Sequence, residues 1–326
     1  DFKDNNLHVV SYSVPVDEWI SLSKLQEHLY SLPEQPDAIP YVTSYYEEKW
    51  GFCISHKDRL KLNEGKYHVF IDSTLENGSL TYGSYIIKGK SEQEIFLSTY
   101  ICHPSMANNE LSGPVIAAFI GKWLASQPRR YTYRIVFIPE TIGSITYLSQ
   151  HLEELRENVL VGFNLSCIGD DKAYSYVASP YEKTLADKVA SNVLSFKHPD
   201  FIKYSFLNRA SDERQYCSPG IDLPLVTLSR SKFGTYPEYH TSLDNLDFVT
   251  PEGLLGGYGL VQDCISVIEN NRVFRVTCYG EPQLGKRGLY PNLSIKKSDA
   301  YASVRTMMNF IAYADGNNDL LQISNI

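Results

Sequence analysis

The 326-residue sequence lacks the features of a membrane protein, a nucleic-acid-binding surface or a disulfide scaffold. Apolar runs such as 135–139 are much shorter than the roughly 18 apolar residues that a spanning helix needs. Lys and Arg number 30 against 38 Asp and Glu, a net charge of −8, so the chain has no broad basic face for phosphates. Six cysteines without a Cys-x-x-Cys pair indicate reduced thiols, and we expect a cytoplasmic protein.

Several catalytic motifs are missing as well. The sequence has no Gly-x-Ser-x-Gly elbow, no glycine-rich phosphate loop and no His-Glu-x-x-His helix, which disfavours the corresponding hydrolases, nucleotide enzymes and metalloproteases. It does have 43% hydrophobic residues, enough for a real core, and 24 tyrosines against only 3 methionines.

Strand and helix patterns alternate from about residue 90 onward. Apolar strands are predicted at 94–102, 131–139, 159–168 and 223–229, and helices at 114–126, 145–155, 182–196 and 251–269. Alternation of this kind predicts an α/β fold with a mostly parallel sheet and helices on both faces. In such a sheet, ligands bind beyond the carboxyl ends of the strands.

The segment before this alternation has a different sequence pattern. Residues 36–90 consist of short, aromatic, β-type pieces, and 67–74 and 80–88 flank Asn77-Gly78, a strong hairpin signal. We therefore expect an inserted β subdomain at 36–90 within an α/β domain made of 1–35 and 91–275.

Polar residues that could bind a metal or take part in catalysis lie at the predicted strand ends. His103 and Glu140 each follow an apolar strand directly, and His240 lies in a loop after the strand at 223–229. A single histidine at a strand end is more often a hydrogen-bonded structural group, and Glu140 could simply cap the next helix. Two histidines and several carboxylates at successive strand ends make a functional site a comparable alternative.

These residue types suit a zinc site. Zinc accepts histidine nitrogen and carboxylate oxygen, and lowers the pKa of a bound water that a carboxylate can deprotonate. We expect His103 and His240 as ligands and Glu140 as the base. The third ligand is left open among three acidic residues, which are Glu110, Asp212 and Glu213. A Cys102–His103 dyad is not expected, because adjacent residues of a strand point in different directions.

Three stretches carry a resemblance to a known family. These are Cys-His-Pro-Ser at 102–105, Asp-Glu-Arg-Gln-Tyr-Cys-Ser-Pro-Gly at 212–220, and Glu-Tyr-His-Thr-Ser at 238–242. They resemble the zinc aminopeptidase and glutaminyl cyclase clan, and especially the bacterial aminopeptidase-like proteins associated with polysaccharide biosynthesis. The resemblance implies a zinc exopeptidase-like fold, with a linker and partial winged-helix-like domain at 276–326. It also implies that an N-terminal portion and the rest of this last domain are missing here.

The sequence departs from that family where metal ligands are expected. The resemblance implies carboxylates where this chain has Asn109, Thr141 and Ser166. Neutral side chains cannot balance the charge of two divalent ions, so we expect a single zinc held by His103, His240 and one carboxylate.

Two functions remain open at this point. The first is a metal-dependent peptidase or amidohydrolase acting on a small peptide-like or amino-sugar substrate, with Arg214 or Tyr239 stabilising the oxyanion. The second is a catalytically degenerate fold that binds a glycan or nucleotide-sugar, favoured by the lost ligands and the abundant tyrosines. A weaker third possibility is regulation through the C-terminal segment, and the acidic balance makes nucleic acid an unlikely partner.

Overall fold

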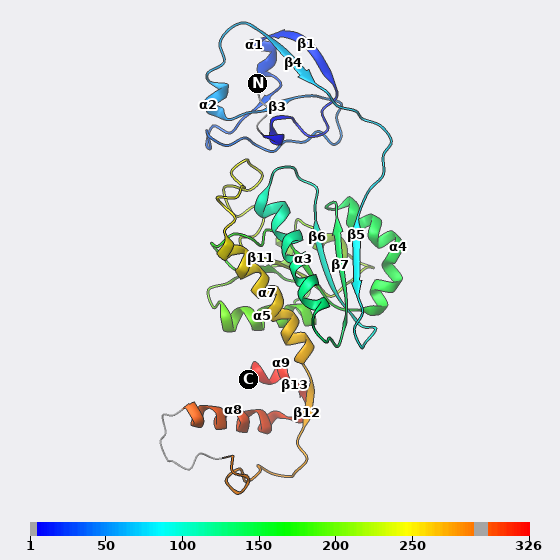
Figure 1. Cartoon of the computed structure of the whole chain (residues 1–326), viewed down its shortest axis with the longest axis vertical. Coiled ribbons are helices and arrows are strands. Elements are labelled where there is room, and N and C mark those ends of the chain that lie inside the picture. Colours follow the sequence, from blue (N-terminus) through cyan, green and yellow to red (C-terminus); the bar gives the residue numbers. More distant parts are fainter. Residues whose placement is uncertain (1–4, 290–298) are drawn as a thin grey trace.

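The computed structural model describes residues 5–289 and 299–326 and places them in three parts along one long axis (Figure 1). A small N-terminal unit lies at one end, an α/β domain with the main sheet lies in the middle, and the C-terminal segment lies at the other end. None of the helices in the described ranges is long and apolar enough to cross a membrane.

The middle domain is built on a seven-stranded sheet with the order β10-β9-β11-β8-β6-β7-β5. Its strands are β5 (Gly83–Ile87), β6 (Glu94–Tyr100), β7 (Thr132–Ile138), β8 (Val159–Leu165), β9 (Ser175–Val177), β10 (Ile202–Tyr204) and β11 (Leu225–Ser229). The four central strands β11, β8, β6 and β7 are parallel, whereas β5 joins β7 in antiparallel fashion. The expected mostly parallel α/β sheet is therefore confirmed.

Helices cover both faces of this sheet. They are α3 (Ser112–Ala125), α4 (Ile142–Asn158), α5 (Leu185–Lys197), α6 (Glu213–Tyr216) and α7 (Pro251–Asn270). On one face, α3, α5 and α7 bury the larger core, which includes Ile116, Val189 and Ile265. On the other face, α4 packs Tyr147 and Leu148 against the sheet. The central strands are covered on both faces: all of β6 and all but one residue of β8 are buried, as is typical of parallel sheets.

The N-terminal unit has its own small core, formed around Ile20, Leu25 and Val69. Its elements are η1 (Asn6–His8), β1 (Val16–Ser21), α1 (Leu22–Gln26), β2 (Leu29–Tyr30), β3 (Phe52–Cys53), α2 (His56–Arg59) and β4 (Lys66–Ile71). β1 pairs with β4 in antiparallel fashion and β2 pairs with β3 in parallel.

These pairings change two expectations. The prediction of a hairpin around Asn77-Gly78 is wrong, because β4 pairs with β1 while β5 belongs to the main sheet. Residues 16–30, expected in the α/β domain, contribute strands to the N-terminal unit instead. The physical reason is burial: Val69 and Ile71 of β4 are buried in the small unit, whereas Ile87 of β5 is buried in the main core. Two strands that serve different cores cannot form one hairpin.

The C-terminal segment continues directly from α7. It contains β12 (Val273–Arg275), η4 (Gly285–Arg287), α8 (Asp299–Tyr313), β13 (Asp315–Asp319) and α9 (Leu320–Ser324), and β12 pairs with β13. Its end contacts the α/β domain, because Leu321 is buried in the main core and Asn192 of α5 donates a hydrogen bond to Ser324.

A buried ion pair joins the two central strands β6 and β7. Arg134, 2% exposed, donates two hydrogen bonds to Glu94, at 2.6 and 2.9 Å, and contacts Glu154 and the Tyr147 hydroxyl. Removing one partner of such a pair leaves a buried, unbalanced charge.

We therefore expect Arg134→Met to lower the free energy of unfolding by about 3–5 kcal/mol, measured by denaturant titration. The matched control is Lys88→Met, which removes the exposed Lys88–Glu92 pair and should cost less than about 1 kcal/mol. Equal losses in the two variants would contradict this role of Arg134.

Candidate active site

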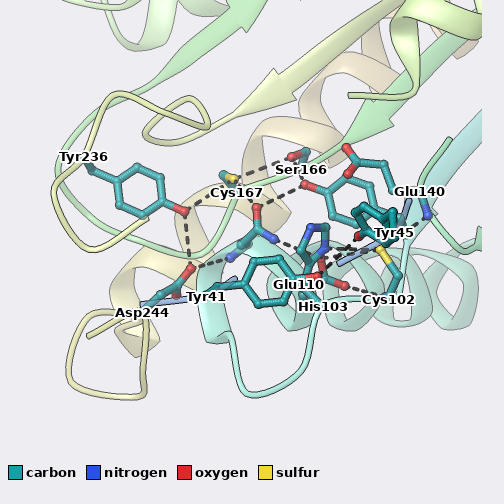
Figure 2. A network of polar contacts seen from close by, with 12 residues as sticks. Tyr41, Tyr45, Cys102, His103, Glu110, Glu140, Ser166, Cys167, Tyr236 and Asp244 are labelled. Atoms are coloured by element: carbon teal, nitrogen blue, oxygen red, sulfur yellow. Dashed lines mark hydrogen bonds and ion pairs between the residues drawn. The ribbon is translucent and has the colours of Figure 1, made fainter. Parts of the chain in front are cut away.

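The candidate site lies at the carboxyl edge of the central strands. The chain brings together residues that follow β6, β7, β8 and β11, which are Cys102, His103, Glu140, Ser166 and His240. Figure 2 shows the first four of these side chains. This is the edge at which a parallel sheet binds ligands.

Backbone strain is concentrated at this edge. Of the seven described non-glycine residues with positive φ, five lie in or next to the site, which are Tyr12, Ser105, Thr141, Cys167 and His240. Such conformations cost about 1–3 kcal/mol each and persist where the surrounding structure enforces them, commonly at functional sites. The strain is an independent indication that these loops are held in place for chemistry.

His103 is oriented by Glu110. Its Nδ1 lies 2.5 Å from Oε1 of Glu110, which also accepts from the Asn109 amide, while Oε2 accepts the backbone N–H of Cys102 at 2.6 Å. Burial alone would lower the pKa of His103, but the bond and the negative charge of Glu110 outweigh it and raise the pKa above its ordinary value. Because both Glu110 oxygens are occupied by protein donors, this carboxylate positions the imidazole rather than facing the cavity.

His240 faces His103 from the loop that follows β11. The two ring centroids are 4.9 Å apart, and Tyr239 stacks on the far side of His240 at 3.9 Å. Nε2 of His240 is buried and has no hydrogen-bond partner in the described chain. Burial, together with the nearby His103, lowers the pKa of His240 to about 4, so its imidazole is neutral at pH 7 and free to accept a ligand.

Glu140 lies beside the two histidines in a mostly buried position. Burial raises the pKa of its carboxyl group, while the nearby His103 and a hydrogen bond with Ser211 partly oppose the rise. Arg214 lines the same cavity and donates a hydrogen bond to Thr141 Oγ1. The Glu140 carboxyl group and the Arg214 guanidinium group thus line the same cavity.

Asp212 lies next to Glu140 at the beginning of α4, and its buried Oδ2 has no hydrogen-bond partner in the described chain. Its Oδ1 accepts the backbone N–H of Thr141 at 2.8 Å and the Ser144 hydroxyl at 2.7 Å, at the beginning of α4. Burial and the neighbouring Glu140 charge raise the pKa of Asp212 to about 7. Neither Asp212 nor Tyr239 is among the residues that line the cavity, whereas His103, Glu140, Arg214 and His240 are.

The cavity, of about 460 Å³, is closed on one side by tyrosines of the N-terminal unit. We call Tyr12, Tyr41, Tyr45 and Tyr46 the tyrosine wall; Tyr41 meets both histidine rings edge-on at about 5 Å. Backbone bonds tie this unit to the histidine loop, because the Tyr41 N–H donates to the His240 carbonyl at 2.9 Å. The sequence suggested Tyr216, Tyr236 and Tyr239 as tyrosines beside the site, but none of them lines the cavity.

Cys102 lies close to His103, although the sequence predicted that their side chains would point in different directions. Its Sγ lies 3.2 Å from Nδ1 of His103, contrary to the expectation that the two side chains diverge. The reason is local: β6 ends at Tyr100, so the two residues lie in a loop and the alternation of a strand does not apply. Donor atoms of Cys102, His103 and Glu140 all lie within 4.8 Å of one another, a grouping that could hold a metal ion.

A neutral hydrogen-bond network fills the region where the family resemblance implies further carboxylates (Figure 2). The Tyr100 hydroxyl lies 2.7 Å from Ser166 Oγ and donates to Asn109 Oδ1 at 3.4 Å. The Cys167 thiol, 3.6 Å from the same Asn109 oxygen, accepts from the Tyr236 hydroxyl. These groups bond one another and carry no charge, so they do not fit a second divalent ion.

Comparison with known proteins identifies the family to which this chain belongs. The model of the family described as a domain of unknown function, DUF4910, matches residues 5–271, and a winged helix-turn-helix model matches residues 272–326. The chain is 43% identical over 325 residues to a Clostridium acetobutylicum protein called "Putative polysaccharide biosynthesis protein with aminopeptidase-like domain", covering 99% of this chain and 74% of that protein.

Solved structures agree with this. A crystal structure of a "putative peptidase" from Clostridium acetobutylicum has a TM-score of 0.92 at 42% identity and covers 100% of this chain and 74% of that chain. BSAP, a zinc aminopeptidase from Bacillus subtilis, has a TM-score of 0.57 at 15% identity, covers 74% of this chain and 63% of that one, and shows the fold alone. The resemblance stated from the sequence is confirmed: the chain belongs to the DUF4910 family, has an aminopeptidase-like α/β fold and carries a winged-helix segment after it.

Proposed function

We propose that this protein is a metal-dependent hydrolase of amide bonds, with a single zinc ion held by His103 and His240 and with Glu140 as the general base. The observation that carries the proposal is the neutral His240 imidazole, whose buried Nε2 has no partner in the described chain and whose ring lies 4.9 Å from that of His103. Two imidazoles beside a carboxylate suit zinc. When bound, such an ion supplies Lewis acidity and an activated water.

The protein's own residues supply the remaining steps. A Glu140 oxygen takes the proton from the attacking water and passes it to the leaving amine, and its burial supports this role because the raised pKa favours proton transfer near neutral pH. Arg214, hydrogen-bonded to Thr141 at the cavity wall, stabilises the negative charge that develops on the carbonyl oxygen. Tyr239 holds the His240 ring by stacking rather than by touching substrate.

The substrate is proposed to be a small peptide-like or amino-sugar amide. A cavity of about 460 Å³ accepts one or two sugar or amino-acid units, and the tyrosine wall offers apolar ring faces with polar hydroxyls. The name of the Clostridium acetobutylicum relative supports a role in polysaccharide biosynthesis, which favours an amino-sugar derivative.

A second candidate function is a binding module for a glycan or nucleotide-sugar. The specific observation in its favour is the neutral network in which Asn109 and Ser166, two of the positions where the resemblance implies carboxylates, bond to Tyr100. The two functions differ in whether Glu140 is needed for turnover or only for the shape of the pocket.

Replacing the base tests the first function. Glu140→Gln should lower kcat for N-acyl amino-sugar or aminoacyl-amide hydrolysis by about 10²–10⁴-fold, because the proton acceptor is lost while the side-chain volume is kept. Metal content measured by elemental analysis should stay unchanged. The matched control is Glu153→Gln, an exposed residue of helix α4, which follows Glu140 in the chain, and this variant should keep full activity.

Two results would argue against hydrolysis. One is equal turnover by Glu140→Gln and the wild type. The other is calorimetric binding of an amino-sugar by the wild type with no turnover in the presence of zinc, which would favour the binding module.

The protonation state of His240 gives a second prediction, tested on metal-free protein. Its folded pKa of about 4 lies below the ordinary value of 6.5, so between these values the unfolded chain binds a proton that the folded chain does not. His240 therefore costs stability as pH falls from about 6.5 to 4, on the order of 3 kcal/mol in total. His240→Asn should flatten the pH dependence of the unfolding free energy in this window. A slope identical to that of the wild type would contradict a neutral, buried His240.

A further inference from the structure

We propose that the thiolate of Cys102 is a ligand of the metal, so that the site is a mixed sulfur–nitrogen centre rather than a histidine–carboxylate one. This inference rests on the proposed metal site and names its anionic ligand. It begins from the carboxylates near the site: Glu110 binds His103 and the Cys102 backbone with its two oxygens, and Asp212 binds the start of α4 through Oδ1. Oδ2 of Asp212 has no partner in the described chain, but Asp212 does not line the cavity. The anionic donors left at the cavity are Glu140 and Cys102.

The sulfur lies in a group of possible ligand atoms. Cys102 is exposed and lines the cavity, and its Sγ, a ring nitrogen of His103 and a Glu140 oxygen lie within 4.8 Å of one another. His240 is not in this group; it lines the same cavity, with its ring 4.9 Å from that of His103. The backbone N–H of Glu140 donates to the same sulfur at 3.4 Å. A hydrogen bond to a ligating atom fixes its orientation and tunes its basicity, and outer contacts of this kind accompany protein metal sites.

Charge gives the second reason. Without an anionic ligand, a divalent ion would meet only neutral imidazoles and the base. Coordination breaks the S–H bond of Cys102 and forms a sulfur–metal bond; the proton passes to solvent and no electrons are exchanged. A coordinated thiol loses its proton outright, so the sulfur contributes one negative charge and Glu140 stays free as the base. Sulfur and nitrogen donors favour zinc or cobalt over magnesium or calcium.

Cobalt(II) titration of the intact, metal-free protein tests this ligand directly. The wild type should develop a sulfur-to-cobalt charge-transfer absorption in the near ultraviolet. Cys102→Ser should lose that absorption and bind cobalt at least ~10–100-fold more weakly, since even outer-sphere changes cost that much. Cys278→Ser is the matched control, because Cys278 is the other exposed cysteine in the described chain and lies in the C-terminal segment.

A measurement without mutation covers the case in which Cys102→Ser folds poorly. In the wild type, bound zinc should slow alkylation of Cys102 while leaving Cys278 unprotected, as read by peptide mass spectrometry. Cobalt binding without the charge-transfer absorption, or equal alkylation of Cys102 with and without zinc, would overturn the sulfur ligand and leave the metal hydrolase standing. The charge-transfer absorption without any amide hydrolysis would support the ligand and contradict only the proposed function. No binding of cobalt or zinc would overturn both.

Discussion

The site depends on one buried carboxylate, Asp244, which joins the two loops that carry the histidines. Its side chain accepts the backbone N–H groups of Asn108 at 2.5 Å and Asn109 at 3.0 Å, and its carbonyl accepts that of Ala107 at 2.9 Å. These are free donors at the start of the π-helical turn Ala107–Leu111, where a negative charge is most favourable. Because Asp244 lies only four residues after His240, this bond fixes the distance between the loop after β11 and the loop after β6.

The acidic residues of the site divide into three groups that hold the protein backbone or side chains in place and one that lines the cavity. Asp244 binds a helical turn, Glu110 binds His103, and Asp212 binds the beginning of α4. Each of these three carboxylates accepts at least two hydrogen bonds from the protein, so each is held in one orientation. Glu140 is the one of these carboxylates that lines the cavity, and its charge is one of the causes that raise the pKa of the neighbouring Asp212.

The sequence was enough to predict the parallel sheet and the residues at its strand ends, because both follow from local periodicity. His103, Glu140 and His240 line one cavity at the strand ends, where such a sheet binds ligands. The hairpin at Asn77-Gly78 failed because a turn signal is local, whereas the partner of a strand is decided by the core that buries it. The position of Cys102 failed for a related reason, since it depends on β6 ending two residues earlier.

The tyrosine wall could not be predicted at all, because it depends on how two separately folded units meet. The N-terminal unit has its own core, yet its residues 39–42 are bonded to the histidine loop: a backbone bridge joins Pro40 to Thr241, and Ser242 donates to the Ile39 carbonyl. The same loop is bonded on its other side through Asp244 to the main sheet domain. His240 is thus held from two directions, and any movement of the N-terminal unit would move the tyrosines and a proposed ligand together. In the proposed function, substrate recognition by the tyrosine wall and metal binding by His240 would both depend on this one loop.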